Sequence, residues 1–215
     1  MVRSFIGATA TRLVTVSKRR AEKRKRIPPF CEAGHTPLMP DYRRNRVPGG
    51  TFFFTVNLFD RRSNLLVARI DALRDAVRQV RARAPFHIDA WVVLPDHMHC
   101  LWTLPEGDAN FPDRWRAFKT AFAKSLPVGE PRSLVMTNRG ERGIWQRRYW
   151  EHTIRDDRDF AAHMDYIHFN PVKHGLVAHS ANWPHSSFHR CAASGLYPAG
   201  WKGGGDEPQP TSERL

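Results

Sequence analysis

The sequence predicts an α+β protein built on one antiparallel β-sheet. Short β-branched and aromatic runs alternate with segments of helical periodicity. At 215 residues with 41% apolar side chains, the chain can bury a core, and no apolar run approaches the roughly 20 residues that cross a bilayer. The cysteines are odd in number and widely spaced, which favours a reducing, cytoplasmic setting over a disulfide framework; they are Cys31, Cys100 and Cys191.

The first half of the chain predicts three strands and one helix. The run TFFFTVNL at 51–58 follows a double glycine and is typical of a strand. The segments FHIDAWVVL at 86–94 and HMHCLWTL at 97–104 predict two more strands, joined tightly by Pro95 and Asp96. Between them, apolar residues recur at helical spacing and predict an amphipathic helix; they are Ile70, Leu73, Val77 and Val80.

The second half predicts two helices and one strand. Trp115, Phe118 and Phe122 mark a helix, RYWEHTI at 148–154 a strand, and residues 157–169 a third helix that we expect to end at Asn170–Pro171. A loop rich in Gly, Pro and Arg is expected at 126–143. The first six elements of the order β-α-β-β-α-β-α match the ferredoxin-like arrangement, in which two helices cover one face of an antiparallel sheet. The opposite face remains for the third helix or a ligand.

Positive charge is concentrated at the beginning of the chain. The formal net charge is +13, and residues 1–26 hold nine Lys or Arg and one acid, so 9 − 1 = +8 lies there. Such an excess favours a polyanionic partner, nucleic acid before a membrane surface. Residues 1–38 predict either a basic flexible arm or a misassigned start, because MPDYRR from Met39 would be a natural beginning. The folded domain is expected at 39–201, followed by a disordered tail at 202–215.

Two histidines, His97 and His99, flank Met98 at the start of a predicted strand. Alternate strand residues share a face, so the imidazoles project the same way, roughly 6.5–7 Å apart. They could bind one divalent cation, Mg²⁺ or Mn²⁺, or be ordinary half-buried histidines. We expect Met98 and Leu101 on the other face, in the core.

The third predicted helix carries a tyrosine and an amide on one polar flank. Tyr166 and Asn170 are four residues apart, and this spacing could set a phenol beside a cation held by the histidine pair and the Asn170 amide. Such a cation would neutralise a phosphodiester and align it for attack by the phenol. With a basic chain, the set predicts a strand-transferring nuclease, whereas a tyrosine on an amphipathic helix is by itself more often structural.

Several segments, in the same order, closely resemble the REP-associated tyrosine transposases, where REP stands for repetitive extragenic palindromic. These are domesticated bacterial relatives of single-stranded insertion-sequence transposases within the HUH (His-hydrophobe-His) superfamily. The resemblance spans about Asp41 to Trp201. The matching segments are YRR at 42–44, GGTFFFTVNL at 49–58, AWVVLPDHMHCLWTLPEGD at 90–108, RYWEHTIRD at 148–156, DYIHFNPVKHGLV at 165–177 and NWPHSSFHR at 182–190.

The resemblance implies a role for each residue of the site. His97 and His99 look like the metal-binding histidines, and Tyr166 looks like the catalytic tyrosine that forms a 5′-phosphotyrosine link. Asn170 stands where the insertion-sequence relatives carry a glutamine ligand. The implied substrate is a single-stranded REP hairpin. The short link from Thr153 to Tyr166 favours a monomer, with a dimer as the alternative.

Further residues are candidates for contacts with DNA. Tyr42, Arg43 and Arg44 combine a stacking ring with charge, which suits an unpaired base or a solvated turn. His152 could assist proton transfer. Hairpin phosphates could be contacted by basic residues that are otherwise plain surface charges, namely Arg114, Arg116, Lys119, Arg147, Arg148 and Lys173.

Two other classes of function compete with the nuclease. A hairpin-binding protein without turnover would bind tightly and in a salt-sensitive way but would not cut at any metal level. An RNA-binding ferredoxin-like module would prefer RNA over the same DNA sequence, but the aromatic motif of such modules is absent.

Overall fold

The computed structural model describes residues 45–129, 132–198 and 200–203. The predicted arm at 1–38, the DNA contacts Tyr42, Arg43 and Arg44, and the predicted tail beyond residue 203 lie outside the described residues. The fold given below is that of the described residues within Arg43–Leu215.

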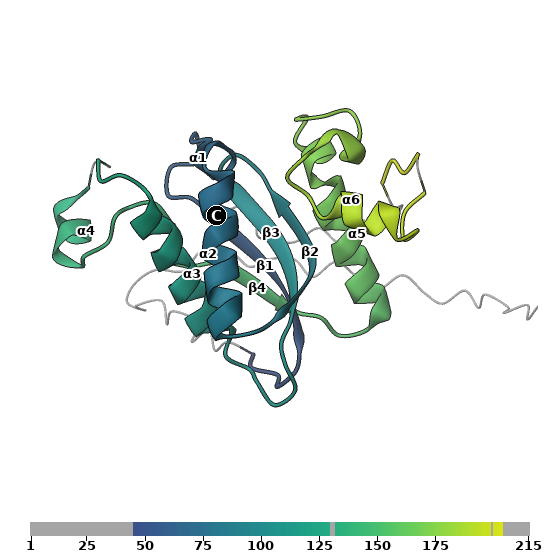
Figure 1. Ribbon diagram of the computed structural model, residues 1–215, viewed down its shortest axis with the longest axis horizontal. Helices are drawn as coiled ribbons and strands as arrows, with labels where there is room; N and C mark the ends of the chain where they lie inside the picture. Colours follow the sequence, from purple (N-terminus) through teal and green to yellow (C-terminus); the bar gives the residue numbers. More distant parts are fainter. Residues whose placement is uncertain (1–44, 130–131, 199, 204–215) are drawn as a thin grey trace, which may run out of the picture. The chain divides into compact units, whose positions relative to one another are not determined.

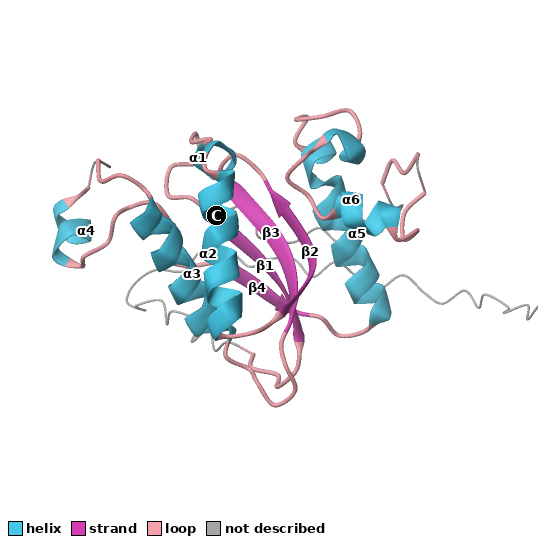
Figure 2. Ribbon diagram, in the orientation of Figure 1, coloured by secondary structure: helices cyan, strands magenta, loops and turns pink. Residues whose placement is uncertain are grey.

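Four strands form one antiparallel sheet with the order β2-β3-β1-β4 (Figure 1, Figure 2). β1 pairs with both β3 and β4 and is therefore central, whereas β2 and β4 are the edges. This architecture confirms the predicted α+β class. The strands are β1 (Thr51–Asn57), β2 (His87–Val93), β3 (His97–Thr103) and β4 (Trp150–Thr153).

Three long helices cover the two faces of the sheet. α2 (Ile70–Arg83) and α3 (Phe111–Ser125) lie on one face, and α5 (Asp157–Lys173) lies on the other (Figure 1). None of the helices in the described ranges has the length and apolarity that a bilayer crossing requires. The short elements are α1 (Leu65–Ala68), α4 (Leu134–Asn138), the 3₁₀ turn η1 (Ser180–Asn182) and α6 (Phe188–Ala193).

α4 lies within the segment that was expected to be a loop. The helix is only five residues long, too short to show helical periodicity. Its start is stabilised locally, because the backbone N–H of Met136 donates to the hydroxyl of Ser133 at 3.2 Å.

α5 continues past the predicted end. We expected Pro171 to end the helix, but Pro171 lies inside it and the last helical residue is Lys173. Pro171 lies in the final turn of α5, where it removes one backbone donor. There the carbonyls of Asn170 and Pro171 still accept from the backbone N–H groups of His174 and Leu176, at 3.0 and 2.9 Å. Asn170 is therefore a helical residue, one turn after Tyr166.

β1 is buried on both faces, which explains its unbroken apolar run. Phe52, Phe54 and Val56 pack with α2 and α3, where Trp102 and Trp115 stack at 4.1 Å between centroids. Phe53 faces α5 instead.

Leu101 was expected opposite the histidines, and this was wrong. Leu101 packs in the cluster beneath α5, with Phe53 and Ile167. Strand residues alternate, so Leu101 shares the face of His97 and His99, while Met98 does lie in the opposite cluster.

Pro95 and Asp96 form a tight turn that fixes the start of β3. The backbone N–H of Leu94 donates to the carbonyl of His97 at 2.8 Å and closes the turn. The N–H of Leu58 donates to the carbonyl of Asp96 at 2.8 Å, which ties the turn to the end of β1. His97 is thus held at the first position of a central strand.

Candidate active site

The structure brings together three of the residues that sequence analysis placed in one site, and the fourth, Asn170, lies one turn after Tyr166 on the same helix. His97 and His99 project from β3 towards α5, which carries Tyr166 and Asn170. The ring centroids of the two histidines are 5.0 Å apart, and those of His99 and Tyr166 are 5.1 Å apart. All four side chains are buried, with at most 5% of their surface exposed.

His97 is oriented by the acid that precedes it. Its Nδ1 donates to Oδ1 of Asp96 at 2.7 Å, and Oδ2 of Asp96 accepts from Nε of Arg61 at 2.8 Å. Burial alone would raise the pKa of Asp96, but the hydrogen bond from His97 and the charges of His97 and Arg61 lower it, so Asp96 stays ionised. The bond to Asp96 engages Nδ1 of His97 and leaves Nε2 as the ring atom that can bind a cation.

His99 is held in the same way by a hydroxyl. Its Nδ1 lies 2.9 Å from Oγ1 of Thr55, its neighbour in the β1–β3 register. Burial lowers the pKa of His99 well below its usual value, and the nearby charges of His97, His174, Lys173 and Arg61 add to that effect. His99 is therefore neutral, and its buried Nε2 has no hydrogen-bond partner among the described residues. When Nδ1–H donates to Thr55, this Nε2 has a free lone pair.

The side chain of Asn170 is a third candidate ligand. Its side chain is fully buried, and neither amide atom has a hydrogen-bond partner within the described ranges. Leaving a buried amide unpaired costs about 1–3 kcal/mol. Two imidazole nitrogens and an amide oxygen suit a divalent cation such as Mg²⁺ or Mn²⁺, so these residues fit the implied metal.

His152 belongs to a second cluster on the same face of the sheet. Its Nε2 bonds Oδ2 of Asp159 at 2.8 Å, and that oxygen also accepts from Nε of Arg155 at 3.0 Å. Nδ1 of His163 lies 3.1 Å from Oδ1 of the same carboxylate and 2.8 Å from the Asp159 carbonyl. Burial raises the pKa of Asp159, but the hydrogen bonds from Arg155 and His152 outweigh it and keep this carboxyl ionised.

The second cluster also has a spacing that a metal could bridge. The ligand atoms of His152, Asp159 and His163 lie within 4.8 Å of one another. Here, however, the side chains bond to one another and Arg155 supplies the positive charge. The set of His97, His99 and Asn170 is therefore the stronger candidate for a metal site, because Nε2 of His99 and the Asn170 amide have no hydrogen-bond partner among the described residues. The role of His152 in proton transfer stays a prediction.

Arg114 was predicted to contact phosphates, and its position contradicts this. The side chain is 5% exposed and its guanidinium is satisfied by the protein. It donates to the carbonyls of Ala84 and Pro85 at 3.2 and 2.7 Å and to the carboxylate of Asp108 at 2.6 Å. Arg114 thus joins α3 to the end of α2.

The other predicted phosphate contacts lie nearer the surface. Arg116 and Arg147 pair with acids, but their side chains are 78% and 67% exposed. Arg148 is exposed as well, while Nζ of Lys119 donates to the carbonyl of Gln146 at 2.8 Å. Lys173 lies beside the site, with Nζ 4.8 Å from the ring centroid of Tyr166. Their contacts with DNA stay predictions.

Sequence analysis missed the residues that orient the histidines. Asp96 stands directly before His97, so its position next to a candidate ligand was a signal. Thr55 and Arg61 gave no such signal, because their roles depend on strand register and on the path of the chain after β1.

Comparisons with known proteins agree with this geometry. No protein-family model matches the chain. A REP-associated tyrosine transposase of Escherichia coli is 50% identical over 165 residues, covering 77% of this chain and 92% of that protein. A putative REP-associated tyrosine transposase of Haemophilus influenzae is 46% identical over 170 residues, covering 78% of this chain and 96% of its own length.

A solved structure is similar over its whole length. The structure of a REP-associated tyrosine transposase bound to a REP hairpin has a TM-score of 0.69 and 48% identity, and covers 82% of this chain and 99% of its own. The fold and the sequence thus define a DNA-processing enzyme of the transposase class. More particularly, the chain belongs to the REP-associated tyrosine transposase family. The resemblance found in the sequence is confirmed.

Proposed function

We propose that this protein is a metal-dependent endonuclease and strand transferase that cuts and rejoins single-stranded DNA at REP hairpins through a 5′-phosphotyrosine link. The observation that carries the proposal is the set of buried donor atoms beside Tyr166. Nε2 of His99 and the amide of Asn170 have no partner among the described residues, and the ring of Tyr166 lies 5.1 Å from that of His99.

His97, His99 and Asn170 would hold the divalent cation. When bound, the cation supplies charge neutralisation and alignment of the scissile phosphate. The protein's own contribution is to orient both imidazoles, through the bonds of Nδ1 to Asp96 and Thr55, so that Nε2 can face the cation. Because all three ligand side chains are buried, water competes poorly for the site.

Tyr166 supplies the nucleophile. Its phenolic oxygen bonds to phosphorus as the bond from phosphorus to the 3′ oxygen breaks. The proton that the phenol loses balances the proton that the departing 3′ oxygen takes up. The new phosphotyrosine conserves the phosphodiester bond energy, so a second DNA hydroxyl can attack it and rejoin the strands.

Lys173 has a supporting role in this proposal. Its ammonium lies over the ring of Tyr166, where it can offset negative charge on the reacting phosphate. A role for the exposed Arg148 at the hairpin backbone is proposed on the same electrostatic grounds.

The proposal includes a monomer that works in the cytoplasm. Tyr166 approaches His99 within one chain, so a second copy is not needed to complete the site. The hairpin partner is proposed because the similar solved structure is bound to a REP hairpin.

The test is covalent capture of labelled DNA. Single-stranded REP hairpins labelled at the 5′ or 3′ end are incubated with the protein and Mn²⁺ and run on a denaturing protein gel, beside Tyr166→Phe and His97→Ala. We expect a labelled protein band with the 3′-labelled hairpin and the unchanged protein alone, because a 5′-phosphotyrosine keeps the 3′ part of the cut strand. A band with Tyr166→Phe would contradict the assigned nucleophile, and hairpin binding without any band would favour a binding protein without turnover.

A further inference from the structure

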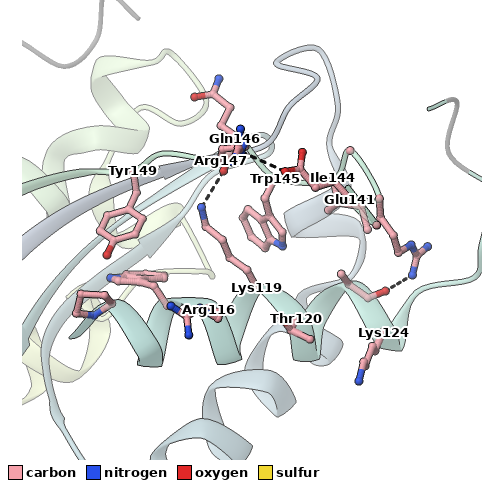
Figure 3. Close-up of a pocket in the computed structure, with 16 residues that line it drawn as sticks. Arg116, Lys119, Thr120, Lys124, Glu141, Ile144, Trp145, Gln146, Arg147 and Tyr149 are labelled. Atoms are coloured by element: carbon pink, nitrogen blue, oxygen red, sulfur yellow. Dashed lines mark hydrogen bonds and ion pairs between the residues drawn. The ribbon is translucent and has the colours of Figure 1, made fainter. Parts of the chain in front are cut away.

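A cavity of about 610 Å³ lies between α3 and the segment 140–149, on the other face of the sheet from α5 (Figure 3). α3 forms one wall, and the chain leading into β4 forms the other. Its volume falls within the roughly 300–1,000 Å³ typical of sites for small organic ligands. Two groups of predicted phosphate contacts meet here, with Arg116 and Lys119 on one wall and Arg147 on the other.

The lining of the cavity is strongly basic. Its charged residues are five cations, Arg116, Lys119, Lys124, Arg142 and Arg147, and one acid, Glu141, which gives 5 − 1 = +4. Two of the cations build the walls. The guanidinium of Arg142 donates to the carbonyls of Leu126 and Pro127 after α3, at 3.0 and 2.5 Å, and Lys119 donates to Gln146.

The remaining three cations are exposed at the rim. Arg116, Lys124 and Arg147 project from both walls and keep their charges in contact with solvent (Figure 3). Cations on either side of an opening suit a phosphate chain that passes between them.

Aromatic rings line the interior between these cations. Figure 3 shows the Lys119 side chain rising between the rings of Tyr149 and Trp145, with its Nζ 5.3 Å from the Tyr149 centroid. Trp115 is 1% exposed, and its indole N–H has no acceptor among the described residues; the same holds for the N–H of Trp145. Unsatisfied indole donors beside stacking rings suit the face and edge of a nucleobase.

Hydrogen bonds connect the cavity to the candidate active site. Gln146 lines the cavity, and its side-chain oxygen accepts from Nδ2 of Asn57 at 3.3 Å. Asn57 pairs with His97 in the β1–β3 register and accepts from Arg61, which also bonds Asp96. Asp96 in turn orients His97. The wall of the cavity is thus connected through hydrogen bonds to the acid that orients His97.

We propose that this cavity binds one unpaired nucleotide of the single-stranded DNA substrate. The base packs against Trp145 and Tyr149, and the flanking phosphates lie on Arg116, Lys124 and Arg147. The assignment rests on the proposed function and deepens it, because it separates recognition of an unpaired nucleotide from the cutting step at Tyr166.

The test measures binding alone, in Tyr166→Phe protein that cannot form the covalent link. Fluorescence anisotropy compares a REP hairpin that has an unpaired flank with the same hairpin lacking it. Adding Arg116→Gln and Lys124→Gln should weaken binding of the flanked hairpin by about tenfold or more and leave the flankless hairpin within about twofold. Arg69→Gln with Arg78→Gln removes the same charge from exposed positions outside the cavity and should change neither affinity.

A second readout needs no change in the cavity itself. A flank with 5-iodouracil at successive positions is irradiated on the Tyr166→Phe protein, and the cross-linked peptide is identified by mass spectrometry. We expect one flank position to cross-link to Trp145 or Tyr149. Equal weakening of both hairpins, no weakening, or cross-links only elsewhere would overturn the assignment. Because no cutting is measured, these outcomes are independent of the test of Tyr166 chemistry.

Discussion

The ring of Tyr166 meets the ring of His99 edge-on, with an interplanar angle of 71° and 5.1 Å between centroids. Phe53 packs against both rings, at 5.8 and 5.6 Å. A helix and two strands therefore fix the proposed nucleophile relative to the proposed metal ligand within one chain.

Replacing His99 should remove metal binding, whereas replacing His152 should not. His99→Ala deletes a buried donor atom, so we expect Mn²⁺ binding to fall below detection in calorimetry. His152→Ala is the matched control, because that side chain already bonds Asp159. Binding lost in His152→Ala and kept in His99→Ala would assign the metal to the second cluster.

Asp96→Asn should weaken Mn²⁺ binding without removing a ligand. The carboxylate fixes the proton of His97 on Nδ1 and raises the basicity of Nε2, and loss of such a partner typically costs about 10–100-fold in metal affinity. Asp60→Asn serves as the control, since this exposed acid pairs with Arg62. Unchanged affinity in Asp96→Asn would show that the orientation of His97 does not depend on the acid.

The free energy of unfolding should fall in acid because His168 is buried without a proton. Burial lowers the pKa of His168 to about 4, and the charge of Arg190 adds to this. The unfolded chain holds that proton up to a pH of about 6.5. Between these values the unfolded state binds more protons, so the free energy of unfolding falls as pH falls, by about 3 kcal/mol at most.

His168→Gln should flatten that dependence. Urea unfolding at pH 7, 5.5 and 4 would compare the variant with the unchanged protein and with His179→Gln, at an exposed position that should keep the original slope. Equal slopes for all three proteins would mean that other groups cause the acid loss.

Phe54→Ala should test the core under α2 and α3. Phe54 is fully buried and contacts the rings of Trp102, Phe111 and Trp115. Truncating such a residue costs about 3–5 kcal/mol of unfolding free energy. Phe59→Ala removes the same ring from a side chain that is 55% exposed and should cost less than about 1 kcal/mol. Similar losses at both positions would contradict the described packing.

The sheet and the long helices followed from local pattern. The aromatic run of β1 and the spaced apolar residues of α2 each indicated one type of element. The predictions for the end of α5 and for Arg114 were wrong because both depend on contacts that the local sequence does not show. α5 continues past Pro171 to Lys173, and the backbone N–H groups of His174 and Leu176 still close its last turn. Arg114 is buried because carbonyls from the α2–β2 connection surround its guanidinium.

The candidate active site could be predicted only in part from the sequence pattern. Strand alternation places His97 and His99 on one face, but their distance from Tyr166 depends on how α5 crosses the sheet. The resemblance to a known family supplied that link. It did not reveal Thr55 as the partner of His99, because pairing between β1 and β3 requires a register that neither segment encodes by itself.

The position of β1 matters for anyone who wishes to retarget the enzyme. Its side chains point alternately into the core under α2 and α3 and into the layer that holds the histidines and the tyrosine. A library that varies β1 would change the stability of the fold and the geometry of the candidate active site together, so the effects of a selected variant could not be assigned to either one. The rim cations of the cavity lie on α3 and before β4 instead, so a library that varies them would test the proposed nucleotide binding while the central strand is left unchanged.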